Sequence, residues 1–254
     1  HQRPGDVLGF LPGRRESQAL QKLLEPLANT CLQVLPLHGD LPIEQQSQVL
    51  HATPEGIRRI VLASNVAESS VTLPSVRVVI DSGLAREPRF DPNSGFSRLD
   101  LVTISQASAD QRAGRAGRVS AGFCYRLWPA SQRLEAMRRA EIQHSELTSL
   151  ALELASWGSS DLPFVDAPPI GPWQAAKDLL RSLGALDAQQ SITPLGKKML
   201  RLGTHPRLAA MLIATHTTQE QALACDLAAL IEARDPLINA RRDDWQSRWQ
   251  ALCD

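Results

Sequence analysis

The sequence predicts an α/β domain with a parallel sheet, followed by an all-helical region. Several short runs in the first half are apolar at nearly every position, as in a parallel sheet that is buried on both faces. Helical stretches alternate with these runs, which is typical of a doubly wound α/β domain. After about Pro129 the strand-like runs stop and helical patterns continue to the end.

The first half contains five predicted strands, two predicted helices and one predicted hairpin. The strands are residues 7–11, 31–37, 59–63, 76–80 and 122–128, and the helices are residues 15–28 and 42–52. Two alternating polar and apolar runs flank a turn rich in Asp, Pro, Asn and Gly, so residues 86–105 are predicted to form a β-hairpin. Ligands of such folds bind beyond the carboxyl ends of the strands, where loops begin at residues 11, 37, 63 and 81.

The second half predicts a succession of helices. Residues 145–158 place Leu and Ala at helical spacing and end at a Gly. After a proline-rich connector, helices at 173–186 and 193–203 flank a polar tip, which is the content of a winged helix. Two more amphipathic helices, at 206–216 and 219–233, begin a predicted bundle. The resulting domain boundaries are 1–130, 131–197 and 198–254.

Composition limits the classes of protein to which the chain can belong. The 254 residues carry 27 basic and 27 acidic side chains, so any site for a polyanion must be local. Between residues 86 and 126, seven arginines face four acidic residues, which leaves a local excess of three positive charges. The four cysteines form no CxxC or Cys/His cluster, so we expect no metal site and a reducing, cytoplasmic location. No apolar run has membrane-spanning length, and the absence of an initiating Met suggests a piece of a longer protein.

Residues 111–118 read QRAGRAGR and contain the strongest local signal. In a helix, the spacing of three between Arg112, Arg115 and Arg118 keeps the arginines near one face. The two intervening glycines each cost about 1 kcal/mol of helix stability relative to alanine. A guanidinium stays charged and grips phosphate with a planar fork, so a phosphate site is one interpretation. A solvated basic face on a surface helix is the other.

Longer stretches resemble the DEAH-box helicases of superfamily 2. Residues 105–128 resemble motif VI of that family, 61–84 resemble motif V, and 7–17 resemble motif IV. Residues 35–46 resemble the segment after motif IV. The helical part is similar to the bacterial HrpB type, in which LTSLALELASWG, LLRSLGAL and HPRLAAML mark the winged helix and the start of the bundle.

The resemblance implies an ATP-driven helicase, acting mostly on RNA, with two RecA-like domains that hold ATP and Mg²⁺ in the cleft between them. This chain would supply the second RecA-like domain, the winged helix and the start of the helical bundle. The sequence has no G-x-x-x-x-G-K-[ST] loop and no Asp-Glu dipeptide, so the first RecA-like domain is expected to be missing. The chain alone is therefore predicted to be inactive. Its expected partners are RNA and the missing domain, which would bind most of the ATP and Mg²⁺.

The resemblance also assigns roles to single residues. In motif VI, Arg115 and Arg118 would act as arginine fingers on the nucleotide's phosphates, Gln111 would orient the attacking water or the γ-phosphate, and Arg112 would brace the helix. In motif V, Glu68 is predicted to pair with a motif VI arginine. The remaining assignments are Ser70 and Thr72 on the nucleotide side, and Ser64, Asn65, Arg86 and Arg89 on the nucleic-acid side.

Two departures from the family pattern affect nucleotide recognition. Many eukaryotic members carry an aromatic residue near Leu50 that stacks on the base, and an Asp near Pro74 that reaches the ribose. Neither Leu50 nor Pro74 can make these contacts. Two alternative functions stay open: a translocase on DNA, and a winged-helix nucleic-acid-binding module without catalysis. The second lacks the dense Lys/Arg stripe that such modules normally show.

Overall fold

The computed structural model describes residues 5–39, 41–51, 55–69, 71–91, 95–118, 120–158, 162–233, 235–237 and 244–253. The chain divides into two compact units, His1–Ala140 and Glu141–Asp254. The finer division into three domains, with limits at residues 130 and 197, stays a prediction.

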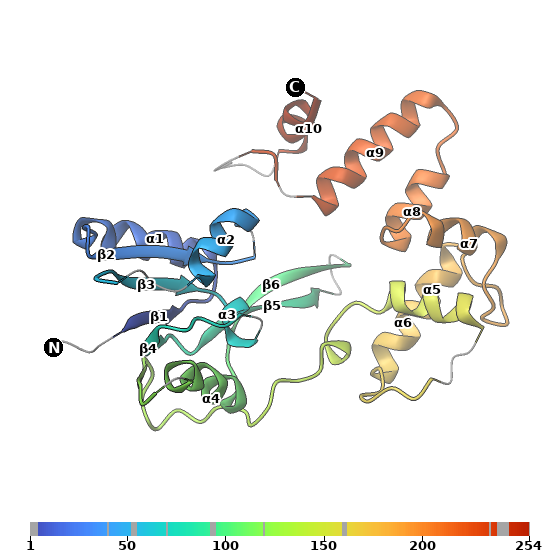
Figure 1. Ribbon diagram of the computed structural model, residues 1–254. Helices are drawn as coiled ribbons and strands as arrows, with labels where there is room; N and C mark the ends of the chain where they lie inside the picture. The colour runs from blue at the N-terminus through green and yellow to red at the C-terminus, as the bar shows by residue number, and fades with distance from the viewer. Residues whose placement is uncertain are drawn as a thin grey trace. The chain divides into compact units, whose positions relative to one another are not determined.

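A five-stranded parallel sheet forms the centre of the first unit (Figure 1). Its order is β2-β3-β1-β4-β7, and all four neighbouring pairs are parallel. The predicted strands are therefore confirmed, with ends shifted by a residue or two. Their bounds are β1 Asp6–Phe10, β2 Leu32–Leu37, β3 Arg58–Ala63, β4 Val76–Asp81 and β7 Phe123–Arg126.

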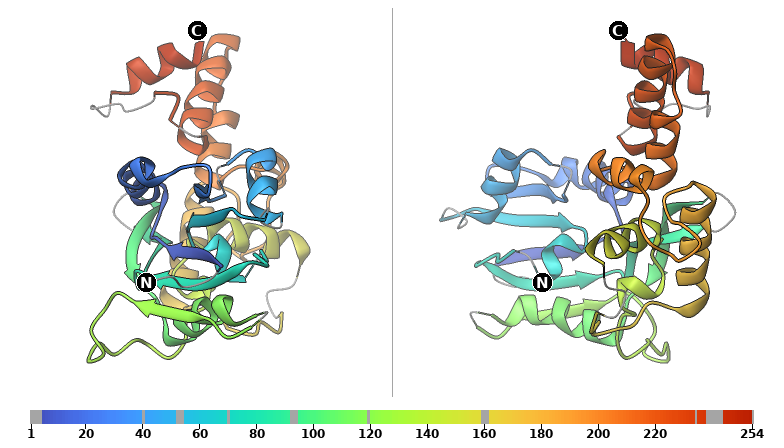
Figure 2. Two further views of the ribbon diagram at one scale, coloured as in Figure 1. Left: turned by 60° about the vertical axis from the view of Figure 1, so that its left-hand side comes forward. Right: turned by 90° about the vertical axis from the view of Figure 1, so that its right-hand side faces the viewer.

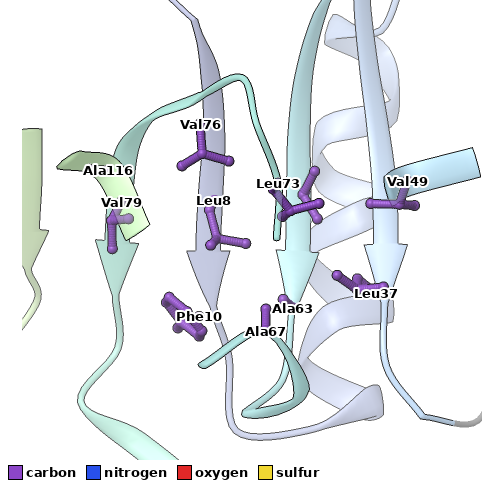
Figure 3. Close-up of a cluster of buried hydrophobic side chains, with 11 residues drawn as sticks. Leu8, Phe10, Leu37, Val49, Ala63, Ala67, Leu73, Val76, Val79 and Ala116 are labelled. Atoms are coloured by element: carbon purple, nitrogen blue, oxygen red, sulfur yellow. The ribbon is translucent and has the colours of Figure 1, made fainter. Parts of the chain in front are cut away.

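The main core lies on one face of this sheet (Figure 3). Leu8 and Phe10 of the central strand are each 1% exposed and pack beside Val61 and Val79 of the flanking strands. Val49, Ala67 and Ala116 come from the helical elements that cover this face, whereas α1 (Arg14–Leu24) lies behind the strands in Figure 3. Strand runs that are apolar at successive positions reflect helices on both faces.

The helices of this unit begin and end close to their predicted positions. Helix α1 is shorter than the predicted helix 15–28. It ends at Leu24, and Pro26 lies in the 3₁₀ turn Glu25–Leu27 that follows. The other helices are α2 (Ile43–Leu50), the one-turn α3 (Val66–Ser69) and α4 (Gln106–Gly114). In Figures 1 and 2, α1 lies beside β2, and α4 lies beside β4 toward the other edge of the sheet.

The arginine run does not continue as one α-helix. Helix α4 ends at Gly114, and Arg115–Gly117 forms a 3₁₀ turn. A 3₁₀ turn has three residues per turn instead of 3.6, and this tightening is common at helix ends. Close packing limits the room after it, because a Cβ on Gly122 would lie 2.1 Å from the carbonyl oxygen of Ala116. Arg112 therefore lies on α4, Arg115 lies in the 3₁₀ turn, and Arg118 directly follows that turn.

The predicted hairpin is confirmed. Strands β5 (Leu84–Asp91) and β6 (Phe96–Thr103) pair antiparallel, and the turn residues 92–94 lie outside the described residues. The hairpin extends beyond the carboxyl ends of the sheet (Figure 1). It starts at Gly83, whose φ of +74° suits glycine and whose added Cβ would lie 2.7 Å from the ring of Trp128.

The second unit consists of helices around their own core of buried Leu, Ala and Met side chains. The short antiparallel bridge between Leu186 and Ile192 lies at the predicted polar tip. Helix α5 ends at Gly158, which has a φ of +85°. None of the helices in the described ranges has the length and apolar character needed to cross a membrane. The helices are α5 (Thr148–Trp157), α6 (Ile170–Ser182), α7 (Pro194–Arg201), α8 (Pro206–Ile213), α9 (Thr218–Glu232) and α10 (Trp245–Cys253), of which α10 was not predicted.

Candidate nucleotide and nucleic-acid site

The carboxyl ends of the parallel strands meet at one edge of the sheet. Backbone hydrogen bonds hold the starts of the loops together there: Leu11 donates its N–H to the Ala63 carbonyl over 2.8 Å, and Ser82 donates to the Phe10 carbonyl over 3.2 Å. Loops at this edge bind ligands in open α/β sheets. Ser64 and Asn65 of motif V follow β3 at this edge, whereas Arg115 of motif VI lies in the 3₁₀ turn after α4. Arg118 directly follows that turn.

The motif V segment leaves β3 and folds at once into the one-turn helix α3. The Ser64 carbonyl accepts from the Ala67 N–H over 3.2 Å, and the Asn65 carbonyl accepts from the Glu68 N–H over 2.9 Å. Ala67 is 1% exposed and anchors the turn in the core, whereas Asn65 is exposed. The exposed Asn65 side chain thus directly precedes α3, and the partly buried Glu68 carboxylate lies near the end of this helix.

Arg112 is a buried side chain with two carboxylate partners. Its Nε donates to Glu68 Oε2 over 3.0 Å, and its Nη1 donates to Asp81 Oδ1 over 2.9 Å. Only 1% of the arginine side chain is exposed, and the Phe10 ring centroid lies 4.8 Å from its Cζ. The prediction that Glu68 pairs with a motif VI arginine is confirmed. Arg112 faces the protein interior.

Arg115 is also largely buried, at 6% exposure, but its partners are backbone carbonyls. Its Nη1 donates to the Val71 carbonyl over 2.7 Å, and its Nη2 donates to the Glu68 carbonyl. Burial, and then the neighbouring charge of Arg118, lower the pKa of Arg115 below its usual range. This arginine therefore binds the backbone of the motif V segment through hydrogen bonds.

Arg118 is exposed and lies closest to the motif V hydroxyl that was predicted to face the nucleotide. Its Nη1 donates to Thr72 Oγ1 over 2.7 Å. Gln111 is also exposed, at the start of the same run on α4. Ser70 lies outside the described residues. The structure therefore brings Arg115, Arg118 and Thr72 together on one side of the motif V segment.

A second group of predicted residues lines a groove at the same edge of the sheet. Ser64, Asn65 and Arg86 all line it, and Arg86 Nη2 is held by Glu16 Oε1 over 2.9 Å. Arg89 is exposed farther along β5 and is not among the residues that line this groove in the described part of the chain. The groove also contains side chains to which sequence reasoning gave no role, including Arg14, Arg15 and His38.

Asp81 is the most informative residue that sequence reasoning missed. It ends β4, is 0% exposed, and accepts hydrogen bonds from Arg112 and from the Gly83 N–H. Its position at the carboxyl end of a buried strand was a usable signal, because a carboxylate there requires a partner. The partner itself is 31 positions away in sequence.

Comparisons with known proteins identify the domains of this chain. Residues 1–120 match the model of the helicase conserved C-terminal domain, and residues 178–203 match that of the winged-helix helicase associated domain HA2. The chain is 39% identical to the ATP-dependent RNA helicase HrpB of Escherichia coli (strain K12), with 99% of this chain and 32% of that protein aligned. It is 35% identical to the human probable ATP-dependent RNA helicase DHX34, with 93% of this chain and 21% of that protein aligned.

A solved structure gives the same result for the fold. The crystal structure of the Escherichia coli DEAH/RHA helicase HrpB superposes with a TM-score of 0.86 at 38% identity, covering 98% of this chain and 34% of that one. The chain thus spans about a third of the length of HrpB, and the match includes both units. In sequence and in fold, the chain belongs to the DEAH-box helicases of superfamily 2 and is of the HrpB type.

Proposed function

We propose that this chain supplies the second RecA-like domain, the winged helix and the start of the bundle of an ATP-dependent RNA helicase. The observation that carries the proposal is the exposed guanidinium of Arg118, which donates to Thr72 Oγ1 beside Arg115 on a RecA-like domain. The relatives' names supply the substrate class: HrpB and DHX34 are RNA helicases, which favours RNA over DNA here.

The arginines of motif VI would stabilise the negative charge on the phosphates during nucleotide hydrolysis. Phosphoryl transfer asks the protein for positioning and for positive charge near the transferred phosphoryl group. Arg118 is the exposed finger in this proposal, and Arg115 is the inner one that fixes the segment carrying Thr72. Gln111 orients the attacking water or the γ-phosphate, and Ser70 completes the nucleotide side.

The rest of the nucleotide site belongs to a part of the protein outside these 254 residues. They contain no phosphate loop, so the first RecA-like domain would hold most of the ATP and its Mg²⁺. The Mg²⁺ supplies charge neutralisation at the phosphates when it is bound. An arginine that acts from across a cleft makes turnover depend on the approach of the two domains.

The groove lined by Ser64, Asn65 and Arg86 is the proposed nucleic-acid side. A hydroxyl, an amide and a guanidinium suit phosphate contacts, which position a strand without reading its sequence. Arg89, farther along the hairpin, adds positive charge near the path of the strand. The winged helix at residues 178–203 belongs to this proposed assembly as a nucleic-acid-facing module.

The decisive experiment measures nucleotide turnover by arginine variants of the natural full-length protein. We expect Arg118→Ala and Arg115→Ala to lower kcat roughly a thousandfold, the scale of a lost arginine finger. Arg115→Lys restores little, because a point charge does not replace the planar fork. Nucleotide affinity changes much less than kcat. The isolated 254-residue chain serves as the negative control and shows no turnover.

Two results would contradict the proposal. One is near-normal turnover in both alanine variants, which would remove these arginines from the mechanism. The other is steady nucleotide hydrolysis by the purified isolated chain, because the phosphate loop and the Mg²⁺ ligands would then have to lie within it. Arg207→Ala, on α8 in the second unit, is a control for the loss of an arginine elsewhere and leaves kcat unchanged.

A further inference from the structure

Three ionisable side chains from three segments contact one another near the residues that are proposed to face the nucleotide. Arg112 from α4 is 1% exposed, Asp81 from β4 is 0% exposed, and the Glu68 side chain from α3 is 16% exposed. Their formal charges sum to one negative charge. Glu68 has an additional donor, because the Ser108 hydroxyl donates to its Oε1 over 2.7 Å. Both oxygens of the Glu68 carboxylate are therefore directed by α4.

Stability alone is a poor reason for such a cluster. Moving charged groups out of water costs several kcal/mol for each ion, and well-packed apolar residues of similar volume are often at least as stabilising. One buried oxygen of Asp81, Oδ2, also has no hydrogen-bond partner among the described residues. The cluster instead fixes the orientation of α4. Nε and Nη1 of one rigid guanidinium bond to two different carboxylates, which fixes the rotation of α4 about its axis.

Glu68 is the residue at which this cluster joins the rest of the site. Its side chain holds Arg112, its backbone carbonyl accepts from Arg115, and its backbone N–H donates to the Asn65 carbonyl over 2.9 Å. One residue thus contacts the bracing arginine, one proposed finger, and the loop that lines the proposed nucleic-acid groove. A one-turn helix is short enough for a shift at Asn65 to be transmitted to Glu68 as a rigid displacement.

We propose that Glu68 is a positioning residue for nucleotide hydrolysis, acting through Arg112 with Asp81 as the second anchor. By fixing α4, the pair sets where the 3₁₀ turn after it places Arg115 and Arg118. This inference rests on the proposed function of those two arginines. Glu68 touches neither nucleotide nor water in this scheme. Its effect is on the position of the fingers, so it changes kcat and leaves nucleotide affinity nearly unaltered.

The test compares two glutamates of similar burial in the natural full-length protein. Glu68 and Glu87 have side chains that are 16% and 14% exposed, and each pairs with an arginine, at 3.0 Å and 2.8 Å respectively. Glu68→Gln removes the charge that directs Arg112, whereas Glu87→Gln removes the charge that holds Arg138. Turnover is measured without nucleic acid, together with KM for nucleotide and the melting temperature.

We expect Glu68→Gln to lower kcat by roughly a hundredfold, the scale of a small misplacement of catalytic groups, with KM within about twofold. Glu87→Gln keeps kcat. Asp81→Asn also lowers kcat and leaves KM nearly unchanged. If Glu68→Gln does not fold, Ser108→Ala provides the second variant: it removes one constraint on the Glu68 carboxylate without leaving a charge unpaired, and it lowers kcat by a smaller factor at unchanged KM.

The outcomes separate this inference from the function on which it rests. If Arg118→Ala and Arg115→Ala both leave kcat intact, the proposed function fails. If Arg118→Ala lowers kcat but Glu68→Gln and Ser108→Ala behave like Glu87→Gln, the positioning role alone is refuted. A rise in KM with unchanged kcat would also refute it, because Glu68 would then act on nucleotide binding. A fall in melting temperature without a change in kcat would make the cluster purely structural.

Discussion

At the scale of single residues, a buried ion pair ties α2 to the sheet. Asp6 and Arg59 are each 2% exposed, and Arg59 Nε donates to Asp6 Oδ2 over 3.0 Å. The same guanidinium donates through Nη1 to the carbonyls of Val49 and His51 at the end of α2. An arginine at a helix C-terminus satisfies carbonyls that have no partner within the helix. The pair therefore fixes both strand pairing and the end of a helix.

We expect Asp6→Asn to lower the free energy of unfolding by about 3–5 kcal/mol, because it leaves the Arg59 charge buried and uncompensated. Urea unfolding followed by circular dichroism measures this change. The control is Asp100→Asn, which breaks an ion pair with Arg98, whose side chain is 69% exposed, and changes stability by less than about 1 kcal/mol. If both substitutions lower the free energy of unfolding by the same amount, burial does not determine how much an ion pair contributes to stability.

At the scale of elements, the start of α5 depends on one carboxylate. Glu146 accepts from the Thr148 N–H over 2.9 Å and from the Thr148 hydroxyl, and its Oε2 lies 3.3 Å from His205 Nε2. Burial of Glu146 raises its pKa, but the hydrogen bonds from His205 and Thr148 outweigh burial. The net result is a pKa below the usual value of 4.5. This carboxylate joins the start of α5 to the start of α8.

The lowered pKa predicts a pH dependence of stability. Below pH 4.5 the unfolded chain binds a proton at Glu146 more readily than the folded chain does, so this contribution is present above that pH and is lost as the pH falls through the lower folded pKa. Glu146→Gln is therefore less stable than the wild type at pH 7, and the difference narrows with acidification. Urea midpoints from pH 7 to pH 3 measure it. Glu153→Gln, an exposed change on the same helix, controls for the loss of a glutamate and leaves the urea midpoint at pH 7 close to that of the wild type.

The hairpin β5–β6 offers a second prediction at this scale. It extends beyond the carboxyl edge of the sheet and carries two exposed leucines, Leu99 at 62% and Leu101 at 53%. Leu99 lines the same groove as Arg86. These exposed positions suit contact with a nucleic-acid strand. We expect the hairpin to separate or steer nucleic-acid strands in the full-length protein.

Replacing residues 90–97 with a short Gly-Ser turn should then spare nucleotide turnover and impair duplex unwinding. Turnover and unwinding are measured on the same preparation, with a fluorescent duplex for the second. The control is a substitution outside the hairpin, Leu23→Ser at an exposed site on α1, which leaves both activities unchanged. If the shortened hairpin reduces both activities to the same extent, its role is structural.

At the scale of the whole molecule, this half of the nucleotide site offers little to select a base. Leu50 is 36% exposed at the end of α2 and has no hydrogen-bonding group on its side chain. Pro74 is exposed and has no backbone N–H to donate. The identified polar groups, Arg115, Arg118 and Thr72, all suit phosphates.

We therefore expect the full-length enzyme to turn over ATP, GTP, CTP and UTP with kcat/KM values within about tenfold, roughly 1.4 kcal/mol. A pocket that hydrogen-bonds its substrate rejects analogues by about 10⁴–10⁵. Steady-state kinetics with the four nucleotides decides between these cases. A hundredfold preference for ATP would contradict the prediction and would place a base-reading group in another part of the protein.

The sequence by itself determined the class of fold, because that information is local. Apolar strands, intervening helices, the hairpin at 84–103 and the Gly stop at 158 all follow from periodicity and turn chemistry within a few residues. The order of motifs V and VI likewise indicated the family, and the expected carboxyl edge of the sheet is where the groove lined by Ser64, Asn65 and Arg86 lies.

Only the tertiary structure decided what each arginine does. Arg112, Arg115 and Arg118 are equally spaced in sequence, yet the first is paired with buried carboxylates, the second with backbone carbonyls, and the third is exposed. Their partners lie 28 to 47 positions away, so no local pattern specifies them. Which guanidinium remains available to a phosphate is therefore set by long-range packing, in which burial and pairing compete for each charge.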